Sequence, residues 1–228
     1  MRKRNRRKSG RGKSVYLWVG LLIIVAAIVG TYLATIGSPR SNNSGASPLT
    51  ISPQNPVLGS KTAQFAIFEF GDFQCPSCDY WAKTQGPILV QNLVDTGKAK
   101  LVWRDFIIYD SDSRLAANAA YAAGEQGKFW EFHDLLYANQ GRANSGWVTQ
   151  QLMISYAQRL GLNLTQFTQS MNSGKYDSLI DSNFQAGQQA GVNGTPTFFV
   201  VGPDGHYVTI SGPQPETVFE RAISSLGG

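Results

Sequence analysis

A buried strand that runs directly into two cysteines is the feature that most restricts how this chain can fold. Residues 65–70 are apolar except for Glu69, and the only two cysteines of the sequence, Cys75 and Cys78, follow closely. Pro76 suits the first helical position, where its missing N–H loses no hydrogen bond. The spacing of three residues then places both sulfurs on one helix face, within reach of a disulfide. The pattern predicts a strand, a short loop and a helix that begins with a dithiol.

The two sulfurs are expected to differ in acidity. Cys75 would occupy the N-cap, where backbone N–H groups and the helix dipole favour a thiolate and lower its pKa from about 8.5 into the range of roughly 3.5 to 7.5. Only Cys75 needs to be exposed. We therefore predict that Cys75 is the nucleophile, that Cys78 is the resolving cysteine, and that the pair forms a redox-active disulfide.

Two other uses of the cysteines stay open at this point. Half of a zinc site would need more ligands, and His133 and His206 are the only histidines in the chain. Both are better interpreted as surface or core polar residues. A purely structural disulfide across three residues would close too small a loop to stabilise the fold much. Redox chemistry is the favoured interpretation, and no metal, flavin or nucleotide is implied.

The charge pattern at the N-terminus predicts a membrane anchor. Eight of the 20 basic residues lie within residues 1–14, and no acidic residue precedes Glu69. The uncharged residues 15–37 are long enough to span a bilayer, and the positive charge predicts a cytoplasmic tail with the remainder outside. A nucleic-acid-binding tail and a cleaved signal peptide are the alternatives. An uncleaved single-pass anchor is favoured, which puts the dithiol in an oxidising space.

Residues 38–60, rich in Ser, Pro, Asn and Gly, are typical of a linker, and one globular domain is expected at residues 61–228. Apolar runs and turn signals predict an α/β order of elements. Strands are expected at residues 65–70, 100–106, 197–201 and 207–211. Helices are expected at residues 75–95, 113–126, 128–138, 148–160, 164–170, 176–189 and 215–226.

This order resembles a thioredoxin fold that carries a helical insertion at about residues 111–190. The specific likeness is to the DsbA family of extracytoplasmic thiol:disulfide oxidoreductases, particularly its membrane-anchored BdbD-like branch. It rests on residues 68–78 (FEFGDFQCPSC), 103–106 (WRDF), 124–130 (GEQGKFW) and 191–197 (GVNGTPT). Many relatives carry a second cysteine pair near Ala122 and Ser170, and some have Pro-His between the two active-site cysteines. The missing second pair excludes a second disulfide, and Pro76-Ser77 in place of Pro-His leaves the oxidising strength open.

The resemblance implies a substrate-binding edge beside the dithiol. The bond between Thr195 and Pro196 is expected to be cis, which leaves the Thr195 backbone free to pair with an extended peptide beside Cys75. Pro76 and Ser77 are expected to contact the same substrate. The alternative is an ordinary trans proline that ends a turn before a strand.

Glu69 is the polar residue that interrupts the first strand, and burial there would raise its carboxyl pKa. The resemblance implies that it relays a proton for the buried sulfur. The alternative is a structural carboxylate paired with Lys100 or Arg104.

The expected function is donation of the Cys75–Cys78 disulfide to thiols of exported proteins, at the outer face of a bacterial cell membrane. By resemblance, a quinone-linked membrane oxidase of the DsbB or vitamin K epoxide reductase type would regenerate the disulfide. A disulfide reductase or isomerase is the alternative within the enzyme class. A peptide-binding chaperone or assembly factor that works without catalysis is the alternative outside it.

Overall fold

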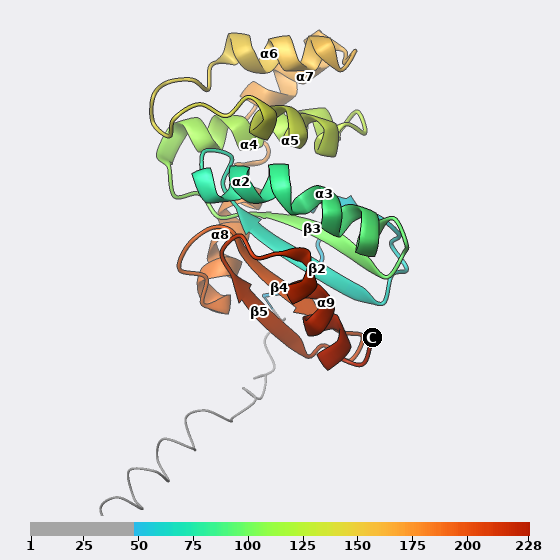
Figure 1. Cartoon of the computed structure of the whole chain (residues 1–228). Helices are drawn as coiled ribbons and strands as arrows, with labels where there is room; N and C mark the ends of the chain where they lie inside the picture. Colours follow the sequence, from blue (N-terminus) through green and yellow to red (C-terminus); the bar gives the residue numbers. More distant parts are fainter. Residues whose placement is uncertain (1–47) are drawn as a thin grey trace, which may run out of the picture. The chain divides into compact units, whose positions relative to one another are not determined.

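The computed structural model describes residues 48–228. The expected tail at residues 1–14, the anchor at residues 15–37 and the start of the linker lie outside the described residues. Within residues 48–228, none of the helices is long and apolar enough to cross a membrane. The described residues form an α/β fold in which one mixed sheet carries helices on both faces (Figure 1).

Within the described range, the sheet has five strands in the order β1-β3-β2-β4-β5. The central strand β2 (Phe65–Gly71) runs parallel to β3 (Ala99–Asp105) and antiparallel to β4 (Thr197–Val201). The short β1 (Val57–Leu58) and β5 (Tyr207–Ser211) form the two antiparallel edges. All seven residues of β2 are buried, which explains its nearly continuous apolar sequence. The dithiol therefore follows the carboxyl end of the central strand.

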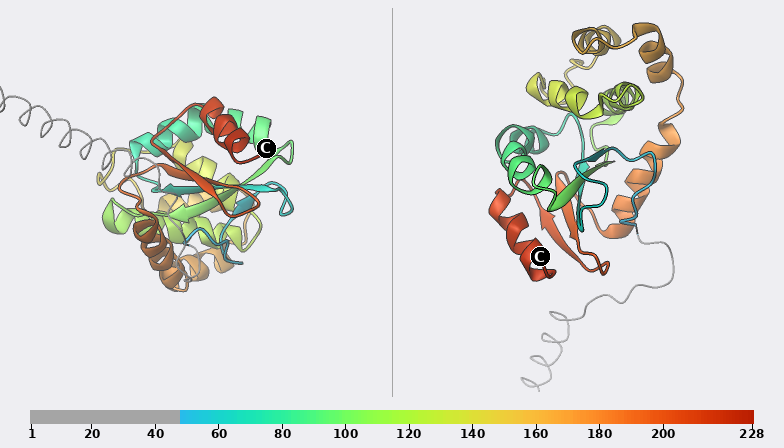
Figure 2. Two further views of the ribbon diagram at one scale, coloured as in Figure 1. Left: turned by 90° about the horizontal axis from the view of Figure 1, so that it is seen from below. Right: turned by 90° about the vertical axis from the view of Figure 1, so that its right-hand side faces the viewer.

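Helices cover both faces of this sheet (Figure 2). On one face lie α2 (Pro76–Thr84), α3 (Gly86–Leu89) and the π-helical η1 (Val90–Val94), together with α9 (Glu216–Ser225). On the other face, α8 (Asp177–Ala190) packs against β3. The first group buries an apolar cluster that includes Phe65, Ile67, Trp81, Leu89, Phe198, Val200, Phe219 and Ile223.

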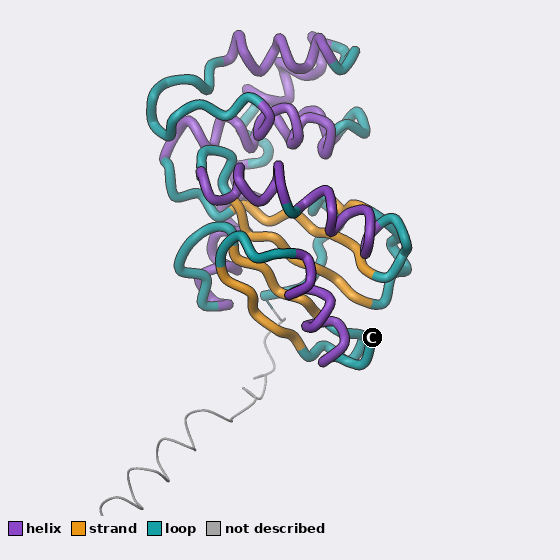
Figure 3. Tube along the Cα trace, viewed as in Figure 1, coloured by secondary structure: helices purple, strands orange, loops and turns teal. Residues whose placement is uncertain are grey.

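The expected helical insertion is present between β3 and β4. It consists of α4 (Asp110–Gly124), α5 (Phe129–Ala138), α6 (Gln150–Arg159) and α7 (Leu164–Asn172), followed by α8. Figures 1 and 3 show α4 to α7 stacked beyond α2, at one end of the sheet. Their common core is built from the alanine-rich α4 and from large side chains that include Phe132, Leu136, Met153, Tyr156 and Phe167.

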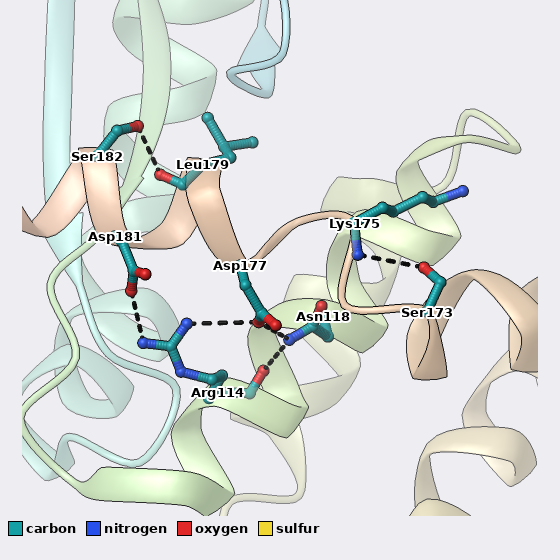
Figure 4. Close-up of polar contacts among 8 residues, drawn as sticks. All are labelled: Arg114, Asn118, Ser173, Lys175, Asp177, Leu179, Asp181 and Ser182. Carbon is teal, nitrogen blue, oxygen red and sulfur yellow. Dashed lines mark hydrogen bonds and ion pairs between the residues drawn. The ribbon is translucent and has the colours of Figure 1, made fainter.

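A polar cluster joins α4 to α8, the helix that follows the insertion (Figure 4). The guanidinium of Arg114 on α4 lies 3.4 Å from Asp177 Oδ1 and 2.7 Å from Asp181 Oδ1, both on α8. Asn118 Nδ2 also donates to Asp177 Oδ1, at 3.3 Å. Since the Arg114, Asp177 and Asp181 side chains are 40–54% exposed, these ion pairs contribute only modestly to stability.

The long helix expected at residues 75–95 is wrong, because the segment divides into α2, α3 and η1. Pro87 causes the break, since it has no N–H to continue the hydrogen-bond ladder of α2. Gln85 both ends α2, with its N–H bonded to the Trp81 carbonyl, and precedes α3. η1 then closes through the bond from Asp95 N to Val90 O.

The prediction of a linker at residues 38–60 is wrong for residues 48–60, because these residues belong to the folded domain. Leu49 is 7% exposed, and β1 pairs with β3. The buried Asn55 donates to Asn183 Oδ1 at 3.2 Å. Arg104 Nη1 donates to the carbonyls of Pro48 and Thr50, at 3.4 and 3.1 Å. The polar, proline-containing composition of residues 48–60 predicted a linker, although its few apolar residues pack on the sheet.

Candidate active site

The loop between β2 and α2 is fixed by a buried carboxylate that the sequence analysis did not single out. Asp72 is 1% exposed and accepts hydrogen bonds from Gln74 N at 2.8 Å and Ser113 Oγ at 2.5 Å. Its second oxygen accepts from the backbone N–H groups of Ile108 and Tyr109, at 2.7 and 3.0 Å. The loop that carries the dithiol is therefore tied to the chain entering α4.

The insertion supports the same loop from a second side. Tyr137 on α5 donates its hydroxyl to the Asp72 carbonyl at 3.2 Å. Gln140 Nε2 donates to the carbonyls of Phe73 and Cys75, at 2.9 and 3.2 Å. The helical insertion thus positions the cysteines directly, beyond covering one end of the sheet.

The two cysteines lie at the start of α2 as predicted, and both are free thiols. Cys75 is the N-cap, and Pro76 follows it at the first turn. Both sulfur-bearing residues are buried, at 4% exposure for Cys75 and 0% for Cys78, whereas Pro76 and Ser77 are exposed. The prediction that Cys75 is exposed is therefore wrong. Cys75 is only slightly more exposed than Cys78, because the Thr195 carbonyl lies against its sulfur.

The environments of the two sulfurs push their acidities apart. The pKa of Cys75 is lowered from 9.0 to about 6, mainly by the hydrogen bond from the Cys78 thiol. The Thr195 side chain and the backbone N–H groups of Cys78 and Ser77 lower the pKa further, while burial opposes the shift. The pKa of Cys78 is raised well above 9.0, first by burial and then by the neighbouring Cys75. The site holds one acidic thiol beside one that resists ionisation.

The segment facing the dithiol has the cis Thr195–Pro196 bond that the family resemblance implied. The Cys75 thiol donates to the Thr195 carbonyl at 3.3 Å, so this carbonyl is not free in the dithiol form. The Thr195 hydroxyl has no hydrogen-bond partner within residues 48–228. It is therefore available to donate to Cys75 when the sulfur ionises.

Glu69 lies on the central strand β2, which leads into the dithiol loop, and is fully buried. Burial raises the pKa of its carboxyl from 4.5 to about 8, and the charges of Asp134 and Cys75 add to the shift. Neither carboxyl oxygen has a hydrogen-bond partner within the described residues. Lys100 Nζ instead donates to the carbonyls of Lys61 and Ala63, each at 3.0 Å.

Arg104, the other basic residue considered for Glu69, is bonded to backbone carbonyls of the N-terminal segment. The structural pairing of Glu69 with Lys100 or Arg104 is therefore wrong. A buried acid with a raised pKa and no fixed partner is suited to giving and taking a proton.

Three side chains near the dithiol were missed from the sequence, namely Asp72, Tyr109 and Tyr137. Burial, and then the Cys75 charge, raise the pKa of the Tyr109 phenol. His206 lies apart from this group, 73% exposed on the β4–β5 hairpin, whereas His133 is buried on α5 with its ring 4.8 Å from that of Tyr137. Among residues 48–228 there is no group of three or more His, Cys, Asp or Glu side chains arranged to hold a metal.

The family model described as Thioredoxin matches residues 52–223, most of the chain and all of the site. The chain belongs to this family. It is 30% identical over 194 residues to the probable disulfide bond formation protein D of Bacillus cereus, covering 83% of this chain and 89% of that protein. It is also 27% identical over 148 residues to the Bacillus subtilis disulfide bond formation protein D, covering 64% and 67% of the two chains.

Solved structures agree with this placement. The crystal structure of oxidised BdbD from Bacillus subtilis aligns with a TM-score of 0.68 and 24% identity, covering 77% of this chain and 94% of that one. A thioredoxin-like oxidoreductase from Silicibacter pomeroyi aligns with a TM-score of 0.66 and 30% identity, covering 80% and 97%. The protein is a DsbA-like thiol:disulfide oxidoreductase.

Another relative is matched over only a small part of its length. The chain is 36% identical over 152 residues to the Na(+)/H(+) antiporter NhaA 1 of Salinispora arenicola, and the matched residues make up 66% of this chain. It spans only 22% of that protein.

Proposed function

We propose that this oxidoreductase donates disulfides to exported proteins outside the cytoplasm, with Cys75 and Cys78 as the exchanged pair. The observation that carries the proposal is the opposite shift of the two thiol pKa values, lowered to about 6 for Cys75 and raised for Cys78. A lowered pKa stabilises the reduced form, and this makes the disulfide a stronger oxidant.

The reaction begins when a substrate thiolate attacks the Cys75 sulfur. The Cys75–Cys78 bond breaks, a mixed disulfide forms at Cys75, and Cys78 leaves as a thiolate. Glu69, protonated below about pH 8, gives its proton to this buried sulfur. A second substrate thiolate then attacks the substrate sulfur of the mixed disulfide. The substrate leaves oxidised, and Cys75 leaves as the stabilised thiolate.

Substrate binding is proposed along the edge formed by Thr195 and Pro196. An extended peptide pairing with the Thr195 backbone would bring its sulfur beside Cys75, a form of strand addition. Pro76 and Ser77 are exposed next to the dithiol and are placed to touch the same peptide. Ile108, 46% exposed in the loop held by Asp72, adds apolar surface close by.

The location and partner follow from the N-terminal sequence and from the oxidant that the cycle requires. The basic residues 1–14 and the apolar residues 15–37 support a single-pass anchor with a cytoplasmic N-terminus. Each cycle leaves a dithiol that must be reoxidised. A quinone-linked membrane oxidase of the DsbB or vitamin K epoxide reductase type would supply the oxidant. No metal, flavin or nucleotide cofactor takes part in the proposed exchange.

A disulfide reductase or isomerase is the second candidate, because a Cys75 pKa of about 6 lies between about 7 for thioredoxin and about 3.5 for DsbA. The reduction potential, measured by equilibration with glutathione, separates the two candidates. A value near −120 mV supports disulfide donation, and a value near −270 mV supports reduction.

A trapping experiment tests the two sulfur roles. Cys78→Ser should accumulate mixed disulfides with exported proteins, because its Cys75 thiolate can attack a disulfide of the substrate, releasing one substrate thiolate, and no Cys78 thiol remains to break the mixed disulfide. Cys75→Ser should trap few. Equal trapping by the two variants would contradict the assignment.

A further inference from the structure

A tight turn leads directly into the proposed nucleophile. Residues 72–75 form this turn, which the hydrogen bond from Cys75 N to the Asp72 carbonyl closes at 3.0 Å. Type I and type II turns of this length differ in the orientation of their central peptide, here the one between Phe73 and Gln74. Because Cys75 follows that peptide, the orientation of the peptide determines where the Cys75 sulfur lies.

Side chains hold both sides of the central peptide. Its N–H, on Gln74, donates to Asp72 Oδ1 at 2.8 Å. Its carbonyl, on Phe73, accepts from Gln140 Nε2 at 2.9 Å. An amide nitrogen carries two hydrogens, and the second bond of Gln140 Nε2 goes to the Cys75 carbonyl at 3.2 Å. One side-chain amide therefore joins the centre of the turn to the N-cap of α2.

Gln140 is the second residue after α5, and its own position is supported by the same helix. Its N–H donates to the Tyr137 carbonyl at 3.2 Å. The Tyr137 hydroxyl donates to the Asp72 carbonyl, also at 3.2 Å, and this is the carbonyl that closes the turn. Since α5 packs beside α2 (Figure 1), this end of α5 can provide donors to the carbonyls of Asp72, Phe73 and Cys75.

The three carbonyls belong to buried residues. Asp72 and Phe73 are each 1% exposed, and Cys75 is 4% exposed. A buried carbonyl that loses its donor must find another or stay unsatisfied, and the cost of leaving it unsatisfied favours a rotation of the peptide. Gln140 itself is only partly buried, so a change at this position can remove the two bonds without opening a cavity in the core.

We propose that Gln140 is a positioning residue, which holds the turn in the conformation that lets the Cys75 sulfur accept from the N–H groups of Ser77 and Cys78. This inference rests on Cys75 being the acidic thiol of the proposed function. Those N–H groups stabilise a thiolate, whereas a disulfide sulfur carries no charge for them to stabilise. Loss of the Gln140 bonds should therefore weaken the reduced form more than the oxidised form, which makes the disulfide a weaker oxidant.

Gln140 carries no charge, so it can act on Cys75 only through geometry and hydrogen bonding. Four ionisable side chains interact with the charge of Cys75, one from each neighbouring segment. They are Glu69 on β2, Cys78 on α2, Tyr109 before α4 and Tyr137 on α5. Gln140→Met leaves all four in the chain and does not alter its net charge. A change in the acidity of Cys75 in this variant would therefore report a change of position.

The test uses the full-length protein and measures two quantities, the pH titration of thiolate absorbance and the equilibrium with glutathione. Gln140→Met keeps the length of the side chain and removes both donors. It should raise the pKa of Cys75 from about 6 to about 7 and shift the glutathione equilibrium about 10-fold toward the oxidised protein. Asn139→Met is the matched control, because this exposed neighbouring amide donates only to the Leu135 carbonyl. It should change neither quantity.

Melting temperatures of the two redox forms separate positioning from a structural role. Gln140→Met should lower the melting temperature of the reduced form more than that of the oxidised form. An equal loss in both forms, with the pKa and the glutathione equilibrium of the wild type, would overturn the proposal.

Tyr137→Phe provides an independent second test, because it removes only the bond to the Asp72 carbonyl. It should shift the glutathione equilibrium in the same direction by a smaller factor, about 3-fold, since Cys75 N still closes the turn. A shift toward the reduced protein in Tyr137→Phe would also overturn the proposal.

The wild type separates this inference from the function on which it rests. A thiolate that titrates near pH 6 in wild type and equally in Gln140→Met would remove the positioning role and leave the proposed function intact. If wild type shows no such titration, or if Cys75→Ser keeps it, Cys75 is not the acidic thiol. That result would contradict the proposed function itself.

Discussion

Two buried acids on neighbouring strands illustrate two uses of a carboxylate in this fold. Glu69 on β2 has no hydrogen-bond partner among the described residues, whereas Asp105 on β3 accepts from Trp103 Nε1 at 3.0 Å, Tyr121 OH at 2.5 Å and Asn183 Nδ2 at 2.9 Å. Burial raises the pKa of both. The two acids are equally buried and differ in their hydrogen-bond partners. Asp105, with three donors, joins the insertion to the sheet, whereas Glu69, with none among the described residues, is available for proton transfer.

The largest loss of stability is expected when Asp105, the hydrogen-bonded acid, is replaced. Asp105→Ala would leave the buried Trp103 and Tyr121 donors without an acceptor and remove one of the two acceptors of Asn183 Nδ2, so we expect a loss of about 3–5 kcal/mol in the free energy of unfolding. Urea denaturation measures it, and Glu220→Ala on the exposed face of α9 should stay within about 0.5 kcal/mol of wild type. A loss below about 1 kcal/mol for Asp105→Ala would mean that its hydrogen bonds do not hold the insertion.

The unpaired acid should behave in the opposite way. The folded pKa of Glu69 is about 8, above its ordinary value of 4.5, so its favourable contribution is complete below pH 4.5 and is lost as pH rises through 8. Glu69→Gln should therefore gain stability over wild type progressively as pH rises from 4.5 to 8. Glu131→Gln is the control, since Lys128 lowers the pKa of that exposed acid. A pH-independent difference between Glu69→Gln and wild type would contradict the raised pKa.

A smaller effect links the dithiol to the same pH range. The folded pKa of Cys75 is about 6, below 9.0, so the stability that its thiolate provides is complete above pH 9 and is lost as pH falls through 6. At pH 7 this contributes about 1 kcal/mol after solvent screening, and we expect reduced protein to melt at or above the temperature of oxidised protein. Calorimetry from pH 5 to 9 measures the difference.

The reduced Cys75→Ser variant provides the control for this measurement, because it should lack the pH-dependent contribution of the thiolate. A clearly higher melting temperature for the oxidised wild type at pH 7 would favour the reductase candidate over disulfide donation.

The smallest effect is expected where acids are paired at the surface. Arg114→Ala removes the ion pairs to Asp177 and Asp181 (Figure 4), and we expect a loss under about 1 kcal/mol that shrinks further in high salt. Arg159→Ala, at the exposed end of α6, is the matched control. A salt-insensitive loss as large as that of Asp105→Ala would show that the surface cluster joins α4 to α8 as firmly as the buried one.

Local sequence predicted much of the sheet and of the dithiol. Strands at residues 197–201 and 207–211 were placed as β4 and β5 lie, because each apolar run is bounded by turn residues. The burial of Glu69 followed from a single polar residue inside an apolar strand. The cis bond at Pro196 came from the family resemblance and not from the residues themselves.

The remaining features depend on contacts between distant parts of the chain. Asp72 fixes the active-site loop through hydrogen bonds from Ile108, Tyr109 and Ser113, which lie 36 to 41 residues later in the sequence. The rings around His133 come from several elements, so the residue could be predicted only as core or surface. Of the two histidines, His133 is core and His206 is surface. Such convergence has no local signature.

The pairing of β1 with β3 also determines where the domain can be cut. β3 is a seven-residue strand with six buried residues, and β1 covers part of its outer edge. A fragment starting at Lys61 would expose that edge, and unpaired apolar edges recruit other chains and aggregate. It would also lose the contacts of Asn55 with Asn183 and of Arg104 with Pro48 and Thr50. A soluble form for biochemistry should therefore retain residue 48, although composition alone marks residues 48–60 as dispensable.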